Sequence, residues 1–336
     1  MESLQGKRVL FIGIGFYDYD EHITRKIENL GGVVHYKRYY PTLSFIQKVS
    51  KKIFKNEKLI VENYFKELLK NLKDEYDYVL VIKGDKIPDF FYKAIRKKYK
   101  CPFILYQWDS IKRVDNFDNT KKYFDRILTF DRLDSIKYGY EFRPLFYKDI
   151  FLSNDENQKE NDLFFSGYLH SDRYEIVKNI LKSYKNIRFK YHLFSHWPHF
   201  FNEQFNRFKK SKPFYNKNLI SFKSISELQN KELMSKSKAV LDIHHPEQSG
   251  LTIRTIESLA MGNKIITTNE DIKNYEFYNT KNILIINRDN IQIPLDFFEE
   301  NEENKNFTNE DKKSYSLEQW VLDVFEVKRR YKNDLK

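Results

Sequence analysis

The chain has 336 residues, 40% of them hydrophobic and 17% aromatic, and a formal net charge of +11. This length predicts two domains of roughly 150 residues, and the apolar content is sufficient for two packed cores. No run of about 18 apolar residues occurs in the sequence, so we expect no transmembrane helix. A single cysteine, Cys101, excludes an internal disulfide and is consistent with a cytoplasmic location.

Strands and helices alternate in the first half of the chain. Buried strands are expected at 8–14, 33–36, 78–82, 103–106 and 126–129. Helical periodicity is found between them, at 21–30, 45–73 and 90–98. Such an alternation predicts a parallel, doubly wound sheet in an α/β domain that spans 1–151.

The first predicted strand ends in two glycines, Gly13 and Gly15. A dinucleotide fingerprint needs a third glycine at position 18, but that position is Asp18, which argues against a nicotinamide enzyme. We interpret Gly15 instead as a place where an acceptor molecule can approach the strand end. Asp18 and Asp20 also have the D-x-D form of a metal site. Two carboxylates at this spacing are common by chance, and we expect no metal there.

Three acidic residues follow the ends of predicted strands: Asp18, Asp85 and Asp109. Ligands of open α/β sheets bind at the carboxyl ends of strands, and an inverting group transfer needs one base near the acceptor hydroxyl. Asp18 and Asp109 are therefore the candidate catalytic residues, and Trp108 can give the acceptor a stacking face. For each aspartate, a turn or a helix N-cap is the structural alternative.

Basic charge is concentrated between residues 41 and 73, where eight lysines stand against three glutamates. Apolar residues recur there at helical spacing, so one or two basic amphipathic helices are expected. Two interpretations remain open: a helix packed on the sheet with a solvated lysine face, or a surface that rests on anionic lipid. The sequence has no zinc-finger spacing, RNP-like aromatic motif or arginine cluster, so nucleic acid is not an expected partner.

A polar stretch without periodicity, 152–162, is the expected interdomain linker. A second αβ series follows it, with strands at 163–166, 188–193, 220–222 and 283–286 and helices at 174–183 and 226–235. This series predicts a second domain of the same class, spanning 163–313. Ser316 and Gln319 then form a capping-box pattern that opens a C-terminal helix within 314–336.

Three histidines, His192, His196 and His199, have spacings that would suit one helical face and a zinc ion. Pro198 is expected to interrupt such a helix, and no acidic residue stands beside the histidines. We therefore expect no zinc site in this segment.

The most informative segment is 238–269, which predicts a strand (239–243), a loop (244–251), a helix (252–261) and a second strand (264–268). Ser249 and Gly250 lead directly into the helix, whose bare N–H groups and positive dipole end suit a phosphate. Arg254 and Glu257 lie on the helix face away from the sheet, and Glu257 could accept hydrogen bonds from ribose hydroxyls. These features predict a nucleotide diphosphate site, with an ordinary βαβ unit as the alternative.

This segment resembles the donor-binding element of bacterial GT-B glycosyltransferases, especially those of lipopolysaccharide and capsule assembly. In that family a Gly-rich loop holds the phosphates of the sugar nucleotide, and a helix glutamate holds the ribose. The resemblance extends to Ser249, Gly250, Leu251, Arg254 and Glu257. Many retaining members have a second glutamate eight positions before the ribose glutamate. Here that position is Ser249, which departs from the retaining pattern.

The start of the second domain also resembles a GT-B donor domain. Gly167 follows a strand and Arg173 lies near a helix start, which implies donor contacts, with arginine suited to paired phosphate oxygens. His244 and His245 follow the strand of the donor motif, and their place implies hydrogen bonds to a phosphate. A His-Pro donor loop also occurs in enzymes that use CMP-activated acids, so a monophosphate donor is an open alternative.

The resemblance implies two Rossmann-like domains that face each other across a cleft, with a C-terminal helix that crosses back to the first domain. It implies a metal-independent glycosyltransferase that moves a sugar from a nucleotide donor to a glycan or lipid-linked glycan in bacterial surface polysaccharide synthesis. No cofactor is expected beyond the donor substrate. A nucleotide-sugar epimerase of the same fold and a non-catalytic membrane-surface protein are the alternatives. The expected location is cytoplasmic, with the inner face of the plasma membrane as the alternative.

Overall fold

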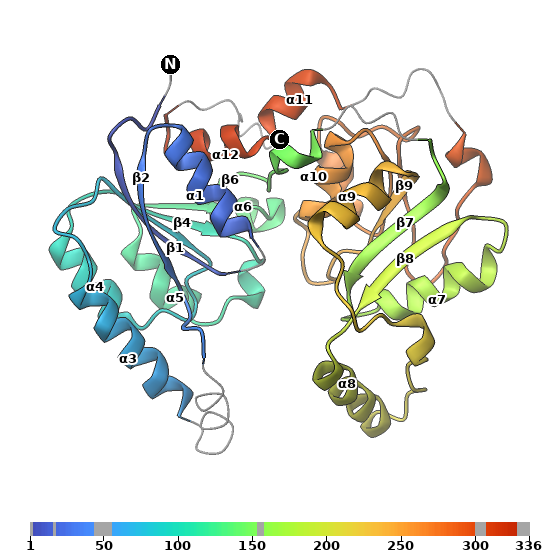
Figure 1. Ribbon diagram of the computed structural model, residues 1–336, viewed down its shortest axis with the longest axis horizontal. Helices are drawn as coiled ribbons and strands as arrows, with labels where there is room; N and C mark the ends of the chain where they lie inside the picture. Colours follow the sequence, from blue (N-terminus) through green and yellow to red (C-terminus); the bar gives the residue numbers. More distant parts are fainter. Residues whose placement is uncertain (1–2, 16–17, 44–55, 153–157, 300–306, 328–336) are drawn as a thin grey trace. The chain divides into compact units, whose positions relative to one another are not determined.

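The computed structural model of the protein describes residues 3–15, 18–43, 56–152, 158–299 and 307–327. The chain divides into two compact units (Figure 1). Unit 1 contains Met1–Leu145 together with Ser314–Lys336, and unit 2 contains Phe146–Lys313. Residues 153–157 of the predicted linker and 45–55 of the predicted lysine-rich helix lie outside the described residues.

Unit 1 is built on a parallel sheet with the strand order β2-β1-β3-β4-β5-β6. Its strands are β1 (Arg8–Gly13), β2 (Val33–Arg38), β3 (Tyr78–Ile82), β4 (Phe103–Gln107), β5 (Arg126–Thr129) and β6 (Glu141–Phe142). The central strands are buried on both faces, which explains their continuous runs of Val, Ile, Leu and Phe. The strands predicted for this half are present within two residues at each end. The prediction omitted the short β6.

Helices cover this sheet. They are α1 (Tyr19–Asn29), α3 (Glu57–Lys70), α4 (Asp89–Lys98), α5 (Phe117–Thr120), α6 (Arg132–Tyr138) and α12 (Leu317–Val324). In α3, Val61, Phe65 and Leu68 are buried in the core, so the described part of the lysine-rich region packs against the sheet. In α12, the fully buried Trp320 makes an edge-to-face contact with Tyr106, with ring centroids 4.9 Å apart. Short 3-10 turns lie at η1 (Ile111–Arg113) and η2 (Lys121–Tyr123).

Unit 2 has a second parallel sheet, with the strand order β11-β10-β9-β7-β8. Its strands are β7 (Asn161–Tyr168), β8 (Phe189–Phe194), β9 (Ser237–Asp242), β10 (Lys264–Thr267) and β11 (Ile283–Ile285). The strand predicted at 220–222 is reduced to one isolated bridge between Ser221 and Phe194. A core of aliphatic and aromatic side chains lies between this sheet and its helices.

The helices of unit 2 are α7 (Arg173–Ser183), α8 (Trp197–Lys209), α9 (Glu227–Ser235), α10 (Ile253–Ala260) and α11 (Asn309–Ser314), which ends at the unit boundary. Its 3-10 turns are η3 (Asp149–Phe151), η4 (Lys217–Leu219), η5 (Glu270–Asn274) and η6 (Leu295–Phe298). The expectation that Pro198 would interrupt a helix was wrong. Pro198 lies in the first turn of α8, where its missing N–H has no helical partner to lose. His192 is on β8, His196 is the N-cap of α8, and His199 lies within α8.

Both sheets follow the same topology. In unit 1, β1 lies between β2 and β3, and in unit 2, β7 lies between β8 and β9. The chain therefore leaves the first strand of each unit toward one side and later returns on the other side, which creates a topological switch point. Open α/β sheets bind their ligands outside the carboxyl ends of the strands at this point.

Candidate functional site

Gly167 lies near the carboxyl end of β7, at the switch point of unit 2. A Cβ atom added to Gly167 would lie 2.9 Å from the Phe165 ring, 3.2 Å from Nη1 of Arg173 and 3.4 Å from Nη2 of Arg254. A side chain at this position would therefore crowd both guanidinium groups. The glycine allows the two cations to approach the backbone of the strand end from different helices.

Arg173, the first residue of α7, links the two strands of the switch point. Its Nη1 donates to the carbonyl of Tyr168 at 3.2 Å, while Nε and Nη2 donate to the carbonyl of Ile243 at 3.1 and 2.9 Å. Burial, and then the positive charge of Arg254, lower its pKa to about 9. Arg173 is thus still a cation at neutral pH, but its described hydrogen bonds are to the protein backbone. Its predicted contact with a phosphate stays a prediction.

Asp242, the last residue of β9, fixes the beginning of α10. Its fully buried carboxylate accepts hydrogen bonds from the hydroxyls of Thr252 and Thr255, at 2.7 and 2.9 Å, and from Nη1 of Arg254 at 3.0 Å. Thr252 is also the N-cap of α10 and accepts the backbone N–H of Thr255. This network aims the Arg254 side chain toward the strand ends.

The predicted phosphate loop is attached to the neighbouring strand by Asn269. Its Nδ2 donates to the carbonyls of Ser249 and Gly250, at 2.8 and 3.4 Å. Leu251, which is only 1% exposed, anchors the end of the loop in the core. The end of the loop is therefore fixed immediately before α10, and its predicted contact with a phosphate stays a prediction.

Glu257 lies on the second turn of α10 and is only 4% exposed. Nearly every residue of this helix is buried, so Glu257 is not on a solvated face as an ordinary amphipathic helix would place it. Its predicted hydrogen bonds to ribose hydroxyls are not tested by the structure.

His244 lies directly after β9 and is held by Arg288. Nη2 of Arg288 donates to Nδ1 of His244 at 3.0 Å and to its carbonyl at 2.7 Å, while Nη1 pairs with both carboxylate oxygens of Asp172, at 2.6 and 2.7 Å. Burial, and then the charge of Arg288, lower the pKa of His244 to about 4. Nδ1 also lies 2.8 Å from the hydroxyl of Thr268, and Nη2 of Arg288 lies 3.4 Å from Nε2, so the arginine contacts both nitrogens of the neutral ring.

His245 has a different environment. It is half-buried, its Nδ1 accepts the backbone N–H of Glu247 at 3.2 Å, and its ring lies 5.9 Å from the ring of His170. The two adjacent histidines therefore have different surroundings: Arg288 holds His244 at the strand ends, whereas His245 contacts the backbone of its own loop.

The switch point of unit 2 has an excess of positive charge. Three guanidinium groups lie there, and the charges of Arg254 and Arg288 both lower the pKa of Arg173. Two carboxylates pair with them: Asp242 with Arg254, and Asp172 with Arg288. The neutral His244 adds a hydrogen-bond donor without adding charge. Such an arrangement, at the start of an eight-residue helix, can attract an anionic group.

The switch point of unit 1 is built around Asp20. Its carboxylate accepts the backbone N–H of Gly15 at 2.5 Å and the hydroxyl of Tyr36 at 2.8 Å. Burial raises its pKa, and these hydrogen bonds oppose the rise. Gly15 has a positive φ of 67°, and a Cβ there would lie 2.5 Å from Nε of Arg38, so the position requires glycine. Gly15 therefore shapes the strand end, while its predicted contact with an acceptor stays a prediction.

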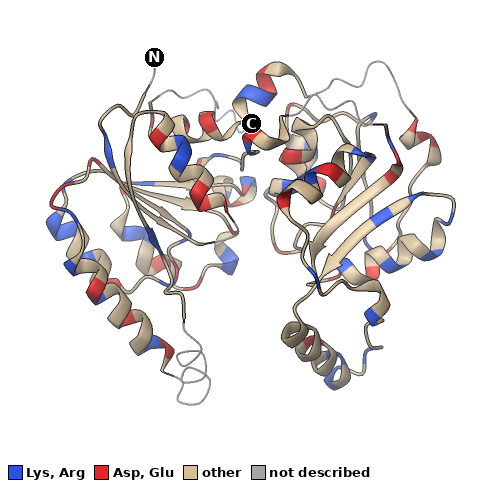
Figure 2. Ribbon diagram, in the orientation of Figure 1, with Lys and Arg blue, Asp and Glu red and all other residues tan. Residues whose placement is uncertain are grey.

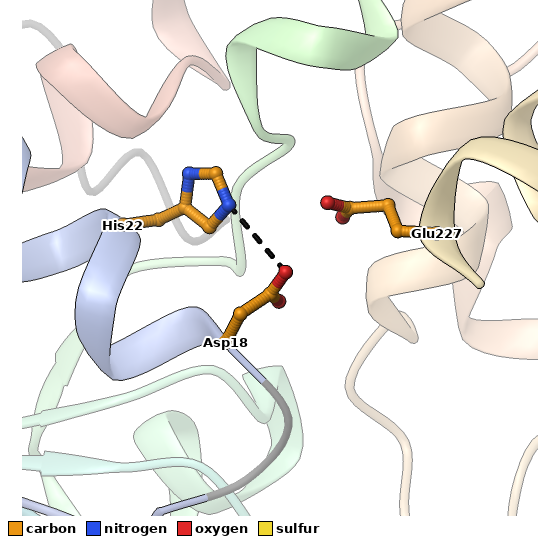
Figure 3. A group of neighbouring side chains, drawn as sticks. All are labelled: Asp18, His22 and Glu227. Atoms are coloured by element: carbon orange, nitrogen blue, oxygen red, sulfur yellow. Dashed lines mark ion pairs between the residues drawn. The ribbon is translucent and has the colours of Figure 1, made fainter.

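Asp18 has different partners from Asp20. It occupies the N-cap position of α1 without a side-chain capping hydrogen bond, and its Oδ2 lies 3.6 Å from Nε2 of His22, one turn along the helix (Figure 3). His22 was not predicted from the sequence. Glu227, also drawn in Figure 3, belongs to unit 2, where it pairs with Lys148. The carboxylate and imidazole of Asp18 and His22 give unit 1 an acid/base pair.

Asp109 is held between two cations. Its Oδ2 lies 2.7 Å from Nζ of Lys83, and its Oδ1 lies 3.7 Å from Nη1 of Arg113. Burial alone would lower the pKa of Lys83, but Asp109 reverses this and the pKa is raised. The carboxylate of Asp109 is thus already engaged by two cations, whereas Asp18 lies beside an imidazole. The adjacent Trp108 is half-buried and packs edge-to-face on Tyr19, with centroids 5.7 Å apart.

Several residues of these sites were missed by the sequence analysis: His22, Asp172, Asp242, Asn269 and Arg288. Asp242 is the last residue of β9 and Arg288 lies three residues after β11, so both stand at the carboxyl edge of the sheet, where open α/β sheets bind their ligands. Asp172 and Asn269 carry no sequence signal of their own, because their roles depend on partners far away in the chain.

No family model and no curated protein matches the chain. Solved structures match it over nearly its full length. A glycosyltransferase from Rickettsia africae has a TM-score of 0.63 at 11% identity, covering 96% of this chain and 97% of that chain. Anabaena Alr3699/HepE in complex with UDP-glucose has a TM-score of 0.57 at 9% identity, with coverages of 95% and 98%. The UDP-GlcNAc 2-epimerase from Neisseria meningitidis bound to UDP-GlcNAc has 0.57 at 12% identity, with coverages of 95% and 99%.

At such low identities these likenesses carry the fold and not the activity. Two parallel sheets with one shared topology agree with them. The chain therefore has the GT-B fold, made of two Rossmann-like domains, and the predicted fold class is confirmed.

Proposed function

We propose that this protein is a glycosyltransferase that uses a nucleotide-activated sugar. The observation that carries the proposal is the convergence of Arg173 and Arg254 on Gly167, beside the start of α10, at the switch point of unit 2. Structures of the same fold have been solved with UDP-glucose and UDP-GlcNAc, which supports a nucleotide sugar as the donor.

In this proposal the donor phosphates lie at the positively charged switch point. Arg254 and the N-terminal N–H groups of α10 stabilise the negative charge that develops on the departing phosphate. The N–H of the neutral His244 ring donates a further hydrogen bond, and Arg173 holds the ends of β7 and β9 together through the carbonyls of Tyr168 and Ile243. Glu257 accepts hydrogen bonds from the ribose. These groups supply the stabilisation that a metal ion would otherwise give, so the transfer is proposed to be metal-independent.

Unit 1 is proposed to bind the acceptor and to supply the base. The acceptor oxygen forms a bond to the anomeric carbon, the bond from that carbon to the phosphate oxygen breaks, and the acceptor proton passes to the base. We favour the pair of Asp18 and His22 for this role over Asp109, because Asp109 is already neutralised by Lys83 and Arg113. Asp109 and Trp108 then serve to position the acceptor.

The finer parts of the proposal concern the acceptor and the location. We propose a glycan or lipid-linked glycan acceptor, as in bacterial surface polysaccharide synthesis, at the cytoplasmic face of a membrane, with the lysine-rich 45–73 region near anionic lipid. Among the helices that the structure describes, none has the length and hydropathy needed to cross a bilayer.

A nucleotide-sugar epimerase is the second candidate, because an epimerase bound to UDP-GlcNAc matches the fold. An epimerase must exchange protons on the sugar itself, so it needs an acid/base pair in the donor site. The two activities differ in their products: an epimerase alters the donor sugar without any acceptor, whereas a transferase releases the nucleotide when an acceptor is added.

The proposal is tested by thermal shift against UDP, GDP, dTDP and CMP and their sugars, followed by assays of nucleotide release. At least one nucleotide should raise the melting temperature of the wild type, and Glu257→Ala should remove most of that rise, because hydrogen bonds to a charged group contribute about 1.5–3 kcal/mol. Glu276→Ala, which changes an exposed glutamate of the same unit, should keep it. A full shift in Glu257→Ala would place the nucleotide elsewhere.

A further inference from the structure

Helix α8 presents an aromatic face to the outside of unit 2. Trp197, Phe201, Phe205 and Phe208 are 50%, 61%, 55% and 67% exposed, and Phe214, shortly after the helix, is 61% exposed. At 100° per residue, the four helical positions fall within an arc of roughly 80°. We call these five residues the α8 aromatic face. A surface helix of a globular protein normally turns its apolar stripe inward, so this orientation is unusual.

The orientation of α8 is fixed by residues that flank its aromatic face. Phe200 is buried in the core of unit 2. The side chain of Gln204 donates to the carbonyl of Tyr215 at 3.0 Å and accepts its N–H at 2.8 Å. Nη2 of Arg207 donates to Glu175 at 2.8 Å. Rotating the helix to bury its aromatic face would break these contacts, so the exposure is a property of the fold.

The aromatic rings also contact one another across the surface. Trp197 stacks on Phe222 with centroids 3.7 Å apart and an interplanar angle of 6°, and the rings of Phe208 and Phe214 are stacked at 6.5 Å. Phenylalanine offers no hydrogen-bonding group to a sugar or to water. A continuous surface of this kind suits an apolar partner more than a glycan.

The charge around the α8 aromatic face is positive. Between residues 196 and 217 the basic residues are Arg207, Lys209, Lys210, Lys212 and Lys217, against a single acidic residue, Glu203. Glu203 accepts a hydrogen bond from Asn206, and Nζ of Lys209 lies over the Phe205 ring. Within the part of the chain that the structure describes, Lys210 and Lys212 form no ion pair. Figure 2 shows α8 as a mostly uncharged helix.

We infer that the α8 aromatic face inserts into the interface of an anionic lipid membrane. An interfacial helix places Trp and Phe at the boundary between headgroups and acyl chains, while nearby lysines bind the headgroups. The aromatic side chains supply the apolar contact, and Lys209, Lys210 and Lys212 supply the preference for anionic lipid. This surface belongs to unit 2 and shares no residue with the lysine-rich 45–73 region or with the proposed donor-binding residues.

Cosedimentation with vesicles tests the inference. The full-length wild type should bind vesicles of phosphatidylcholine with 30% phosphatidylglycerol at low salt, and bind pure phosphatidylcholine at least about tenfold more weakly. Phe201→Ser combined with Phe208→Ser should reduce binding to the anionic vesicles by at least about tenfold, because two exposed apolar side chains are lost. Lys209→Gln, Lys210→Gln and Lys212→Gln together should reduce it by roughly tenfold or more, and 0.5 M salt should reduce the wild type similarly.

Matched controls separate this surface from general changes in hydropathy or charge. Leu228→Ser with Leu295→Ser removes two exposed apolar side chains of unit 2 that lie outside α8. Lys182→Gln, Lys185→Gln and Lys190→Gln remove three exposed lysines of the same unit. Both control proteins should bind like the wild type. Thermal melts of all variants show that each protein is folded.

Fluorescence gives a second, local readout. Of the three tryptophans, Trp197 is 50% exposed and Trp320 is fully buried. Vesicles with brominated acyl chains should quench part of the emission of the wild type, and Trp197→Phe should remove that quenched component while retaining binding.

Three results would overturn the inference. The wild type fails to sediment with anionic vesicles at low salt. The double phenylalanine variant binds as well as the wild type. The wild type self-associates, measured by light scattering, and this self-association disappears in the double phenylalanine variant while vesicle binding is absent. That result would make the face an interface between copies of this chain.

Discussion

The environment of His244 predicts a pH dependence of stability that originates in one side chain. Burial, and then Arg288, lower its pKa from 6.5 to about 4 in the folded protein. Asp242 and Asp172 oppose this shift, and His245 adds to it. In the unfolded chain the pKa returns to about 6.5. Between these two values the unfolded state binds more protons than the folded state, so the free energy of unfolding falls as the pH falls.

The size of the effect follows from the two pKa values. For a single group with these values, linkage gives a loss of about 2.5 kcal/mol in the free energy of unfolding between roughly pH 7.5 and pH 4.5. This stability is fully present above the unfolded pKa and is lost as the pH falls toward the folded pKa. A loss of this size is a large fraction of the stability of an ordinary domain.

The perturbation is His244→Gln. A glutamine amide oxygen can still accept the hydrogen bond from Arg288, but the side chain does not titrate. Hydrogen exchange of β9 and α10 peptides, corrected for the intrinsic effect of pH, reports the stability of unit 2 by itself. The wild type should lose about 2.5 kcal/mol more than His244→Gln over this pH range.

His245→Gln is the matched control, because it removes the adjacent half-buried histidine and leaves the contact with Arg288 intact. It should keep most of the pH dependence of the wild type, because His245 is the smallest contributor to the pKa shift of His244. Equal pH dependence in the wild type and His244→Gln would refute the assignment of a buried, neutral His244. The same pH dependence would then have to come from other groups of unit 2.

Three further predictions concern activity and stability. Turnover should survive EDTA, and a loss on chelation that manganese or magnesium restores would replace the metal-independent mechanism. Asp18→Asn should reduce transfer by about 10²-fold or more while nucleotide binding persists, since the base acts on the acceptor; full turnover in this variant would remove Asp18 from the mechanism. Asp242→Asn should destabilise unit 2 by about 2–4 kcal/mol, because it weakens a buried ion pair with Arg254, whereas Asp289→Asn, an exposed isosteric control, should be neutral in urea unfolding.

The elements of both sheets could be predicted from the sequence because their signals are local. Runs of apolar residues mark β1, β3 and β4, which are buried on both faces, and the 3.6-residue period marks α4 and α10. The segment of 238–269 was predicted as strand, loop, helix and strand, and the structure has β9, α10 and β10 there within two residues at each end. Pro198 shows where such local signals fail. A proline can end a helix or begin one, and its neighbours in the chain do not decide which.

The candidate sites depend on contacts between distant residues. The sequence selected Gly167, Arg173 and Arg254 by resemblance, but only the strand order β9-β7-β8 brings the arginines to one glycine. Strand order itself cannot be read from an alternation of strands and helices, because each crossover can return to either edge of the sheet.

The partners of each candidate aspartate were likewise decided by the tertiary structure. Asp18 and Asp109 were equivalent in the sequence, since both follow a strand end. In the fold, Asp109 lies between Lys83 and Arg113, whereas Asp18 faces His22. The sequence determined which residue types stand at the strand ends. Folding decided their burial and their partners, and these control the pKa and the chemical role of an ionisable group.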